Sequence, residues 1–520
     1  MKEHQISKDD TMNTKVVAIA AVAILVVAGV GVAIALNSGK SSPFTPESYP
    51  ESFLTVLGNA EPDNVIDSKD VAKIKAVVDE NKSVDYKDYY MYDANHDGSI
   101  NQDDVTKVEA IIAALASADP SKGDSWKDVG KVYYVNVDKE IKAYDMTKSN
   151  YVITLIAPPL DSVLAMGGKD LVKGFDSRIE KTGKYYPEYC KTLDFSNPYL
   201  VGSCNDPDTE VISRAANDLG SITVVCGTKA SYGANMESTF EGTNVQVIRI
   251  ASWEYGDTMY GFMTLGFLLK KNAEAKDYFD KYKALEKQIA DFIETVPANK
   301  KVGAAVAYGY DMASNQVKLL GVGTGEYANL MALKPYDSAE DFLGGKVTEG
   351  HGNQINGEDI STMVQQCQLK KIIFLIGTPF QVKTAEGDAE STQTKIKAFY
   401  DHWNTTFGLD TIKAANPGFE WAIAGYSFSS GVSEVLNRLV LSYYLYTDEF
   451  VTTFGAGDAG AARTFISEKI NWYCESIGID EVWGFTGDNT THLGMNLLYC
   501  GVDDDRNIMN GRESGSWSPA

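Results

Sequence analysis

The chain of 520 residues lacks most of the residues and motifs that mark metal and catalytic sites. Its five histidines lie in unrelated segments and its six cysteines form no CxxC pair, which disfavours a structural zinc site or a histidine-rich zinc or manganese site. The metalloprotease string HExxH, the P-loop string and the serine-hydrolase string GxSxG are absent. We therefore expect a protein that is not an enzyme.

Positive charge is also scarce. The 47 Lys and Arg residues face 71 Asp and Glu residues, which gives a formal net charge of −24 and a pI of about 4.7. Such a chain repels nucleic acid and anionic lipid surfaces, so DNA and RNA are excluded as partners. The acidity suits a secreted, solvated surface and the binding of cations.

One long hydrophobic run stands near the start of the chain. Residues 16–36 carry no charge, and a helix of that length spans ~31 Å, about one hydrocarbon core. We expect a single-pass transmembrane anchor there, a cytoplasmic stub at 1–15 and the bulk of the chain on the extracytoplasmic face of the cell membrane. The alternative is a signal peptide that is cleaved after export. Export would permit disulfides, and the nearest cysteine pairs are Cys190 with Cys204 and Cys474 with Cys500, but the sequence leaves their pairing open.

The remaining sequence divides into segments with different patterns. Residues 53–117 hold two similar acidic loops, each followed by a short helix, and polar linkers flank them at 37–52 and 118–128. From Val129 onward, apolar strands alternate with amphipathic helices, which is typical of an α/β fold. The expected strands are 132–137, 151–156, 221–225, 245–250, 302–308, 317–320, 371–376 and 420–424.

An unbroken helical pattern separates these strands into two groups. Apolar residues recur at helical spacing up to Val296, Pro297 stops the pattern, and Asn272 can cap its start. A helix from Ala273 to Val296 would be ~36 Å long. We predict two α/β lobes at 129–256 and 299–475, a helical connector at 257–298 and an extension at 476–520. The alternative is one continuous α/β domain.

The second acidic loop, residues 93–104, has the oxygen donors that calcium prefers. Calcium takes about six to eight oxygen ligands, and short acids and amides at alternate positions converge on one ion when the chain winds round it. Gly98 permits the sharp turn. The expected ligands are Asp93, Asn95, Asp97, Ser99 through its carbonyl, Asn101 through a water, and Asp104.

An earlier copy, residues 59–70, has the same register in a degraded form. Asn59 replaces the first acid, and Asn64 replaces the glycine but tolerates the same left-handed backbone. The expected ligands are Asn59, Glu61, Asp63, Val65, Asp67 and Asp70. For both loops the alternative is a polar turn between helices.

These paired loops resemble the dockerin-type EF-hand repeat, and the resemblance covers residues 53–117. It implies a small all-α domain, bound Ca²⁺ and a cohesin-like surface protein as a partner. A purely structural calcium is an equal alternative, because a unit this small has little core of its own.

The order of segments after Val129 carries a second resemblance. Each predicted lobe repeats a short polar segment, a glutamate, an apolar helix and an apolar strand, and the two glutamates are Glu210 and Glu358. With the long connector, this order resembles the class III solute-binding proteins of ABC importers for ferric siderophores, haem and corrinoids. The resemblance covers about residues 129–475 and implies that both glutamates dock onto arginines of the permease. For each, the alternative is a carboxylate that only stabilises its helix N-terminus.

The same resemblance places the ligand between the lobes, at the carboxyl ends of the strands. The 29 tyrosines are a high count, and aromatic side chains suit a flat or macrocyclic ligand. The cleft candidates are Tyr232, Trp253, Tyr308, Tyr310, Tyr327 and, as an axial ligand to a metal chelate, His351. Core packing, or a solvated loop for His351, is the alternative.

The sequence therefore predicts a membrane-anchored, extracytoplasmic solute-binding protein that delivers a metal chelate to an ABC permease. Two other classes stay open because dockerin-like units accompany carbohydrate enzymes and surface assemblies. They are a dockerin-bearing carbohydrate-active enzyme, for which no paired carboxylates stand out, and a surface scaffold protein.

Overall fold

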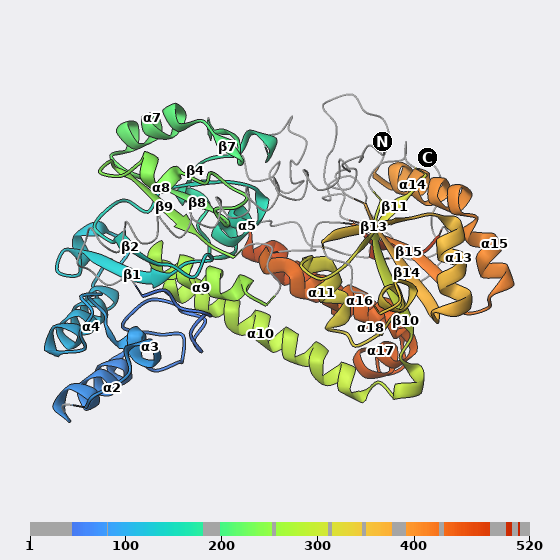
Figure 1. Cartoon of the computed structure of the whole chain (residues 1–520), viewed down its shortest axis with the longest axis horizontal. Helices are drawn as coiled ribbons and strands as arrows, with labels where there is room; N and C mark the ends of the chain where they lie inside the picture. Colours follow the sequence, from blue (N-terminus) through green and yellow to red (C-terminus); the bar gives the residue numbers. More distant parts are fainter. Residues whose placement is uncertain are drawn as a thin grey trace, which may run out of the picture. The chain divides into compact units, whose positions relative to one another are not determined.

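The computed structural model describes residues 44–80, 82–179, 198–251, 256–309, 315–345, 350–376, 392–425, 431–478, 496–501 and 508–509. The chain divides into two compact units, residues 1–47 and 48–520, and the helices and strands described below belong to the second unit (Figure 1).

The single-pass membrane anchor expected from the sequence is corrected here. No helix within the described ranges is long and apolar enough to cross a membrane. The run 16–36 itself lies outside those ranges.

The first lobe is built on a five-stranded parallel sheet with the order β5-β4-β3-β8-β9. All five residues of β8 are buried, as expected for an apolar strand covered on both faces. The strands are β3 Val152–Thr154, β4 Val172–Phe175, β5 Tyr199–Leu200, β8 Ile222–Cys226 and β9 Val245–Arg249; the helices are α5 Ala157–Ala165, α7 Thr209–Leu219 and α8 Met236–Thr239; a small hairpin, β6 Gly202–Ser203 and β7 Asp206–Pro207, precedes α7.

The second lobe has an eight-stranded mixed sheet with the order β13-β11-β10-β14-β15-β16-β17, to which β12 is added alongside β10. The central strands β10, β14 and β15 are parallel. The strands are β10 Gly303–Tyr308, β11 Val317–Leu320, β12 Tyr336–Asp337, β13 His351–Ile355, β14 Leu369–Ile376, β15 Glu420–Gly425, β16 Asn496–Tyr499 and β17 Ile508–Met509. The helices are α11 Gly325–Met331, α12 Ser338–Phe342, α13 Gly357–Gln366, α14 Thr392–Phe407, α15 Leu409–Ala415, α16 Glu434–Leu445, α17 Thr447–Phe454 and α18 Ala459–Ser476, with the short η8 Gly431–Ser433 before α16.

Two helices connect the lobes: α9, Thr258–Leu268, and α10, Asn272–Thr295. The predicted long helix is therefore confirmed to within one residue at each end. Asn272 is its first helical residue and not its cap, because the N-cap is Lys271 and makes no side-chain capping bond. α10 contacts both α9 and α16 (Figure 1), so one helix joins the packing of both lobes.

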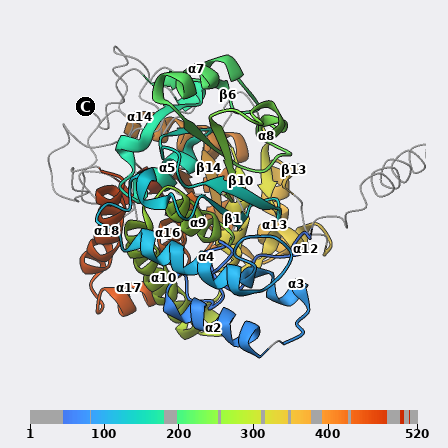
Figure 2. The same cartoon turned by 90° about the vertical axis from the view of Figure 1, so that its left-hand side faces the viewer.

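The two acidic loops are each followed by a helix, as predicted. These helices are α2, Ser68–Asp79, and α4, Gln102–Leu115, which pack against each other; a short helix, α3 Tyr86–Tyr89, lies between them in the sequence (Figure 2). The expected strand at 132–137 is β1, Lys131–Val135, but it lies outside the sheet of the first lobe and forms an antiparallel hairpin with β2, Ile141–Asp145.

The segment that holds the two acidic loops, residues 53–117, is called the acidic loop unit, and it shares its hydrophobic core with the first lobe. Leu57 N–H donates to the Tyr133 carbonyl of β1 at 2.8 Å, and Thr55 N–H donates to Thr264 Oγ1 of α9 at 3.0 Å. Trp126, inside the segment predicted as a linker, is fully buried and lies edge-on to Phe267 of α9. Residues from both parts belong to one continuous cluster of buried apolar side chains.

The five described cysteines are buried, and none of them forms a disulfide with another described cysteine. Cys204, Cys474 and Cys500 are among them, so neither nearest-neighbour pair considered from the sequence forms between described residues. Cys190 lies outside the described ranges.

Gly58 gives a test of how closely the loop unit packs. Its φ is +100°, and an added Cβ would lie 3.0 Å from Val108 Cγ2 and 3.3 Å from Ala94 Cβ. We expect Gly58→Ala to lower the free energy of unfolding by about 2 kcal/mol, from backbone strain and crowding together. Gly220→Ala is the matched control, because Gly220 has a φ of +83° but open space around its Cβ position. Urea unfolding of the full chain should show a smaller loss for Gly220→Ala, and equal losses would contradict close packing at Gly58.

Candidate functional site

The carboxyl ends of the strands of both lobes lie near one junction. α5 follows β3 in the first lobe, η8 follows β15 in the second, and α5 contacts both η8 and α18. Ile156, between β3 and α5, has a φ of +69°, which is rare for a β-branched residue and marks backbone strain at this point. The ligand cleft that the sequence predicts between the lobes would lie at this edge, and it stays a prediction.

The two predicted docking glutamates occupy equal positions in the two lobes. Glu210 is the second residue of α7, and Glu358 is the second residue of α13. Each backbone N–H donates to the side chain of the N-cap residue, Asp208 at 3.0 Å and Asn356 at 2.8 Å. The shared N-cap geometry fixes where each glutamate leaves its helix.

Both glutamate side chains are exposed, and neither carboxylate forms a hydrogen bond or ion pair with the part of the chain that the structure describes. α7 leads into β8 and α13 leads into β14, so each helix begins at the carboxyl edge of its sheet. Two free carboxylates therefore stand at the same edge of the two lobes. This is the geometry that an arginine fork on a partner protein can recognise.

The predicted cleft aromatics are only partly within the described residues. Tyr308 ends β10 and is half-buried, and Tyr232, also half-buried, follows β8 and lies over Gly227. The hydroxyl of Tyr327 bonds Asp337 of β12, which pairs with the first residues of β10, so its tip points to the amino edge of the sheet. Trp253 and Tyr310 lie outside the described residues, as does the side chain of His351 in β13.

A buried arginine that was not predicted holds the segment that carries Tyr232. Arg249 ends β9, and its side chain is 1% exposed. Its guanidinium donates to Glu237 at 2.6 Å and 2.9 Å and to the carbonyls of Gly227, Tyr232 and Gly233 at 2.7 to 3.0 Å. The signal in the sequence is one arginine within the apolar run VIRI at the end of the strand.

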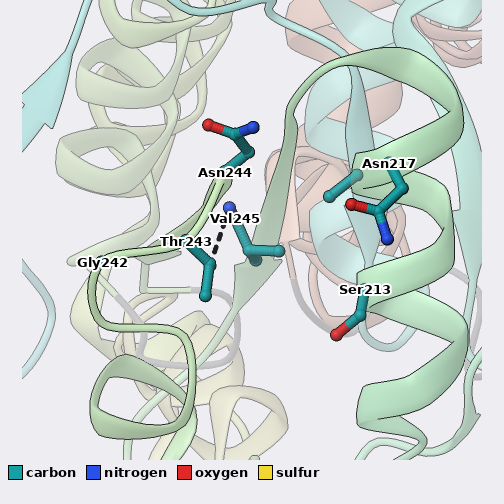
Figure 3. A pocket seen from close by; sticks show the side chains of 7 residues that line it. Ser213, Asn217, Gly242, Thr243, Asn244 and Val245 are labelled. Carbon is teal, nitrogen blue, oxygen red and sulfur yellow. Dashed lines mark hydrogen bonds between the residues drawn. The ribbon is translucent and has the colours of Figure 1, made fainter.

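A surface hollow of about 290 Å³ lies at the other edge of the first sheet. Figure 3 shows Ser213 and Asn217 of α7 on one side and the turn 242–245 on the other. Val245 is the first residue of β9, so the hollow is at the amino edge. It is separate from the junction where the predicted cleft belongs.

The two acidic loops share one framework. In each, the carboxylate at position 12 accepts two backbone N–H bonds, Asp70 from Glu61 and Asp67, and Asp104 from Asn95 and Asn101. Both carboxylates are fully buried. Burial raises the pKa of each to about 6, against the effect of these bonds. Position 12 therefore closes a helix capping box in both copies.

The charges around the two loops differ. In the first loop, Lys69 Nζ lies 2.6 Å from Asp63 and Lys73 Nζ lies 3.0 Å from Glu61, so two expected ligands are already paired with cations. Asn59 keeps a buried Oδ1 without a hydrogen-bond partner. These lysines do not fit a divalent ion in the first loop.

The second loop has no such lysines. Asp103 stands at the position of Lys69, and Lys107, at the position of Lys73, donates instead to the carbonyls of Val129 and Lys131. The Asp93 carboxylate is fully buried and accepts N–H bonds from Asp97 and Gly98 at 3.1 Å and 2.9 Å. The donor set fits calcium better than that of the first loop, although no three acidic, His or Cys side chains of the described chain are clustered closely enough to form a metal site.

The expected cohesin-like partner gains no support from the surface of the loop unit. Among the described residues, the exposed large apolar side chains are Val322 and Tyr336, and both belong to the second lobe. A unit that is embedded in the first lobe and lacks exposed apolar anchors offers little for a partner to bind.

The chain was compared with known proteins at three levels. No family model and no curated protein matches it. Solved structures that are similar include a TroA-like periplasmic binding protein, FepB, of Veillonella parvula (15% identity, 65% of this chain and 95% of that chain, TM-score 0.46). They also include the periplasmic catecholate-siderophore binding protein VctP of Vibrio cholerae (14%, 60% and 99%, 0.42). A third is a periplasmic heme binding protein of Pseudomonas aeruginosa (14%, 57% and 93%, 0.40).

Proposed function

We propose that this chain is a solute-binding protein that holds a metal chelate, such as a ferric siderophore, haem or a corrinoid, between its two lobes and delivers it to an ABC permease. The observation that carries the proposal is the equal placement of Glu210 and Glu358, each exposed and unpaired at the second position of a helix that starts at the carboxyl edge of its lobe. One carboxylate per lobe suits a permease built from two similar subunits.

The connection between the lobes supports this proposal. α10 buries apolar side chains along its length and contacts elements of both lobes. A continuous helix resists bending, so the lobes undergo only small changes in angle. The mechanism is therefore ligand capture, limited closure and docking, with Tyr232 and Tyr308 as the described aromatic candidates for ligand contact.

The docking role predicts a separation of binding from delivery. Glu210→Gln and Glu358→Gln should each reduce uptake by about tenfold, because each removes one charge-assisted contact of ~1.4 kcal/mol or more, and the double variant should abolish it. Uptake of radiolabelled iron as haem or as a ferric siderophore, in cells that contain the cognate permease, measures the effect. Ligand affinity should not change.

Glu241→Gln is the matched control, because Glu241 is exposed in the first lobe away from the helix N-terminus. Its uptake should equal that of the unaltered chain. Native purification followed by absorbance and metal analysis tests the cargo itself. A protein without bound chelate that cleaves a glycan panel would replace this proposal with the carbohydrate enzyme.

We also propose that the second acidic loop, with Asp93, Asn95, Asp97, Ser99, Asn101 and Asp104, binds one Ca²⁺ as a structural part of the first lobe. The absence of paired lysines around its described side chains favours it over the first loop. When bound, calcium would neutralise acids that face one another in this loop.

The two loops give matched variants for this proposal. Calcium should raise the melting temperature of the full chain by several degrees, since a ligand that binds only the folded state stabilises it. Asp97→Asn should remove most of that rise, whereas Asp63→Asn, at the same position of the first loop, should leave it intact. A rise that survives Asp97→Asn but is lost in Asp63→Asn would assign the ion to the first loop instead.

A further inference from the structure

A group of buried polar side chains lies where α10 meets both lobes. Tyr278, Tyr282 and Glu286 lie four residues apart and so share one face of α10. Tyr278 donates to the Val432 carbonyl of η8 at 2.8 Å, and Tyr282 donates to Glu434 of α16 at 2.8 Å. The connector is thus held to the second lobe through hydrogen bonds as well as apolar contacts.

Glu434 is the least satisfied member of this group. Its side chain is buried, at 2% exposure, and its Oε2 has no hydrogen-bond partner. Burial raises the pKa of Glu434 to about 7, although Arg438 and the Tyr282 hydroxyl favour the charged form.

The charged groups around Glu434 are already paired with one another. Arg438, on the same helix, donates to Glu286 of α10 at 2.8 Å and to the Tyr282 hydroxyl at 2.7 Å. Glu286 is also paired with Lys283. Asp257, before α9, lies 3.4 Å from Lys139 and adds negative charge near Glu434. Among the described residues, Glu434 accepts one hydrogen bond, from Tyr282, and forms no ion pair of its own, so its ionised form would be a buried charge without a direct counter-ion.

A second buried carboxyl joins the lobes directly. Asp161 of α5 hydrogen-bonds to Tyr473 of α18, its Oδ1 has no partner, and the residue is 7% exposed. Burial raises the pKa of Asp161 well above its usual range. The titratable groups that face it are Tyr473 and Tyr278. The ring of Trp472 lies against that of Tyr278 in a tilted arrangement, with the ring centroids 4.8 Å apart.

We propose that Asp161 and Glu434 form a protonation-controlled latch, which holds the two lobes and α10 together while both carboxyls are neutral and loosens when they ionise. The use of such a latch in adjusting the lobe angle rests on the proposed function, but the latch itself does not depend on any ligand.

The direction of the effect follows from linkage. A solvated glutamate loses its proton near pH ~4.3, whereas the closed junction keeps the proton to a higher pH. Over that interval the closed state binds more protons than the open state, so the junction weakens as the pH rises and then levels off. The latch is therefore tight in acid and loose above neutrality.

Hydrogen exchange of the full chain without ligand measures this directly. After correction for intrinsic exchange, peptides covering 157–165 and 431–445 should be at least about tenfold less protected at pH 8 than at pH 5, one pKa unit being tenfold. A peptide covering β8 is the internal reference and should change little. Equal protection of the junction at both pH values would overturn the proposal.

Variants assign the effect to the two carboxyls. Glu434→Gln and Asp161→Asn should each reduce the pH dependence, and the pair should remove it. Asp291→Asn, on the exposed side of α10 and paired with Lys287, should leave it unchanged. If Glu434→Gln does not fold, the variant Tyr282→Phe tests the role of Glu434 instead. Loss of its hydrogen bond to the carboxylate should move the midpoint to higher pH, and an unmoved midpoint contradicts the role of Glu434. None of these results depends on whether a chelate is the cargo.

Discussion

The arrangement of the second unit depends on one constraint: helix α10 is buried at both of its ends. Its 24 residues present a stripe that includes Tyr278, Tyr282, Leu285, Ile289, Phe292 and Ile293, all buried. Neither lobe covers this stripe alone: it is contacted by α9, which packs against α5 of the first lobe, and by α16 of the second lobe. The free energy gained by burying these side chains, about 1.5–3 kcal/mol for each large one, therefore depends on both lobes being in place.

The same constraint explains the position of the candidate site. With α10 fixed against both lobes, the elements that follow β3 and β15 are brought into contact, and helices α7 and α13 begin at corresponding edges. The acidic loop unit strengthens the first lobe in this arrangement, because it shares a core with α9 and α10. The ring centroid of Phe53 lies 4.5 Å from that of Tyr260 and 5.1 Å from that of Phe279. The second acidic loop is therefore better regarded as part of a lobe than as a separate binding module.

The helices and strands that could be predicted from the sequence are those that a local pattern of residues encodes. The buried strands β8, β10, β14 and β15 are continuous apolar runs, and α10 has a long helical repeat with a proline stop, so both kinds of element were predicted. β4 and β13 were not predicted, because VKGF and HGNQI contain glycine and polar residues and form strands only through their neighbours. The expectations that had to be corrected include the membrane anchor, which was predicted from a hydrophobic run, and the capping role of Asn272.

Long-range polar contacts could not be predicted in this way. Tyr282 and Glu434 are 152 residues apart, and Arg249 reaches back 22 residues to Gly227, so no spacing in the sequence announces either contact. The lysines that neutralise the first acidic loop lie near it in the sequence, but only their positions in the fold show that they face Glu61 and Asp63. By contrast, the equal placement of Glu210 and Glu358 could be predicted from the sequence, because each residue lies at the start of a helix.

The central claim is that a chelate is held between the carboxyl edges of the two lobes. Hydrogen exchange of the full chain with and without haem, or a ferric siderophore if haem does not bind, tests it most directly. If the chelate binds there, we expect new protection in peptides that follow β3, β8 and β10 and little change in α2, α4 and the outer face of α10. Protection confined to the acidic loop unit or to the hollow beside α7, or no protection with any chelate, would contradict it.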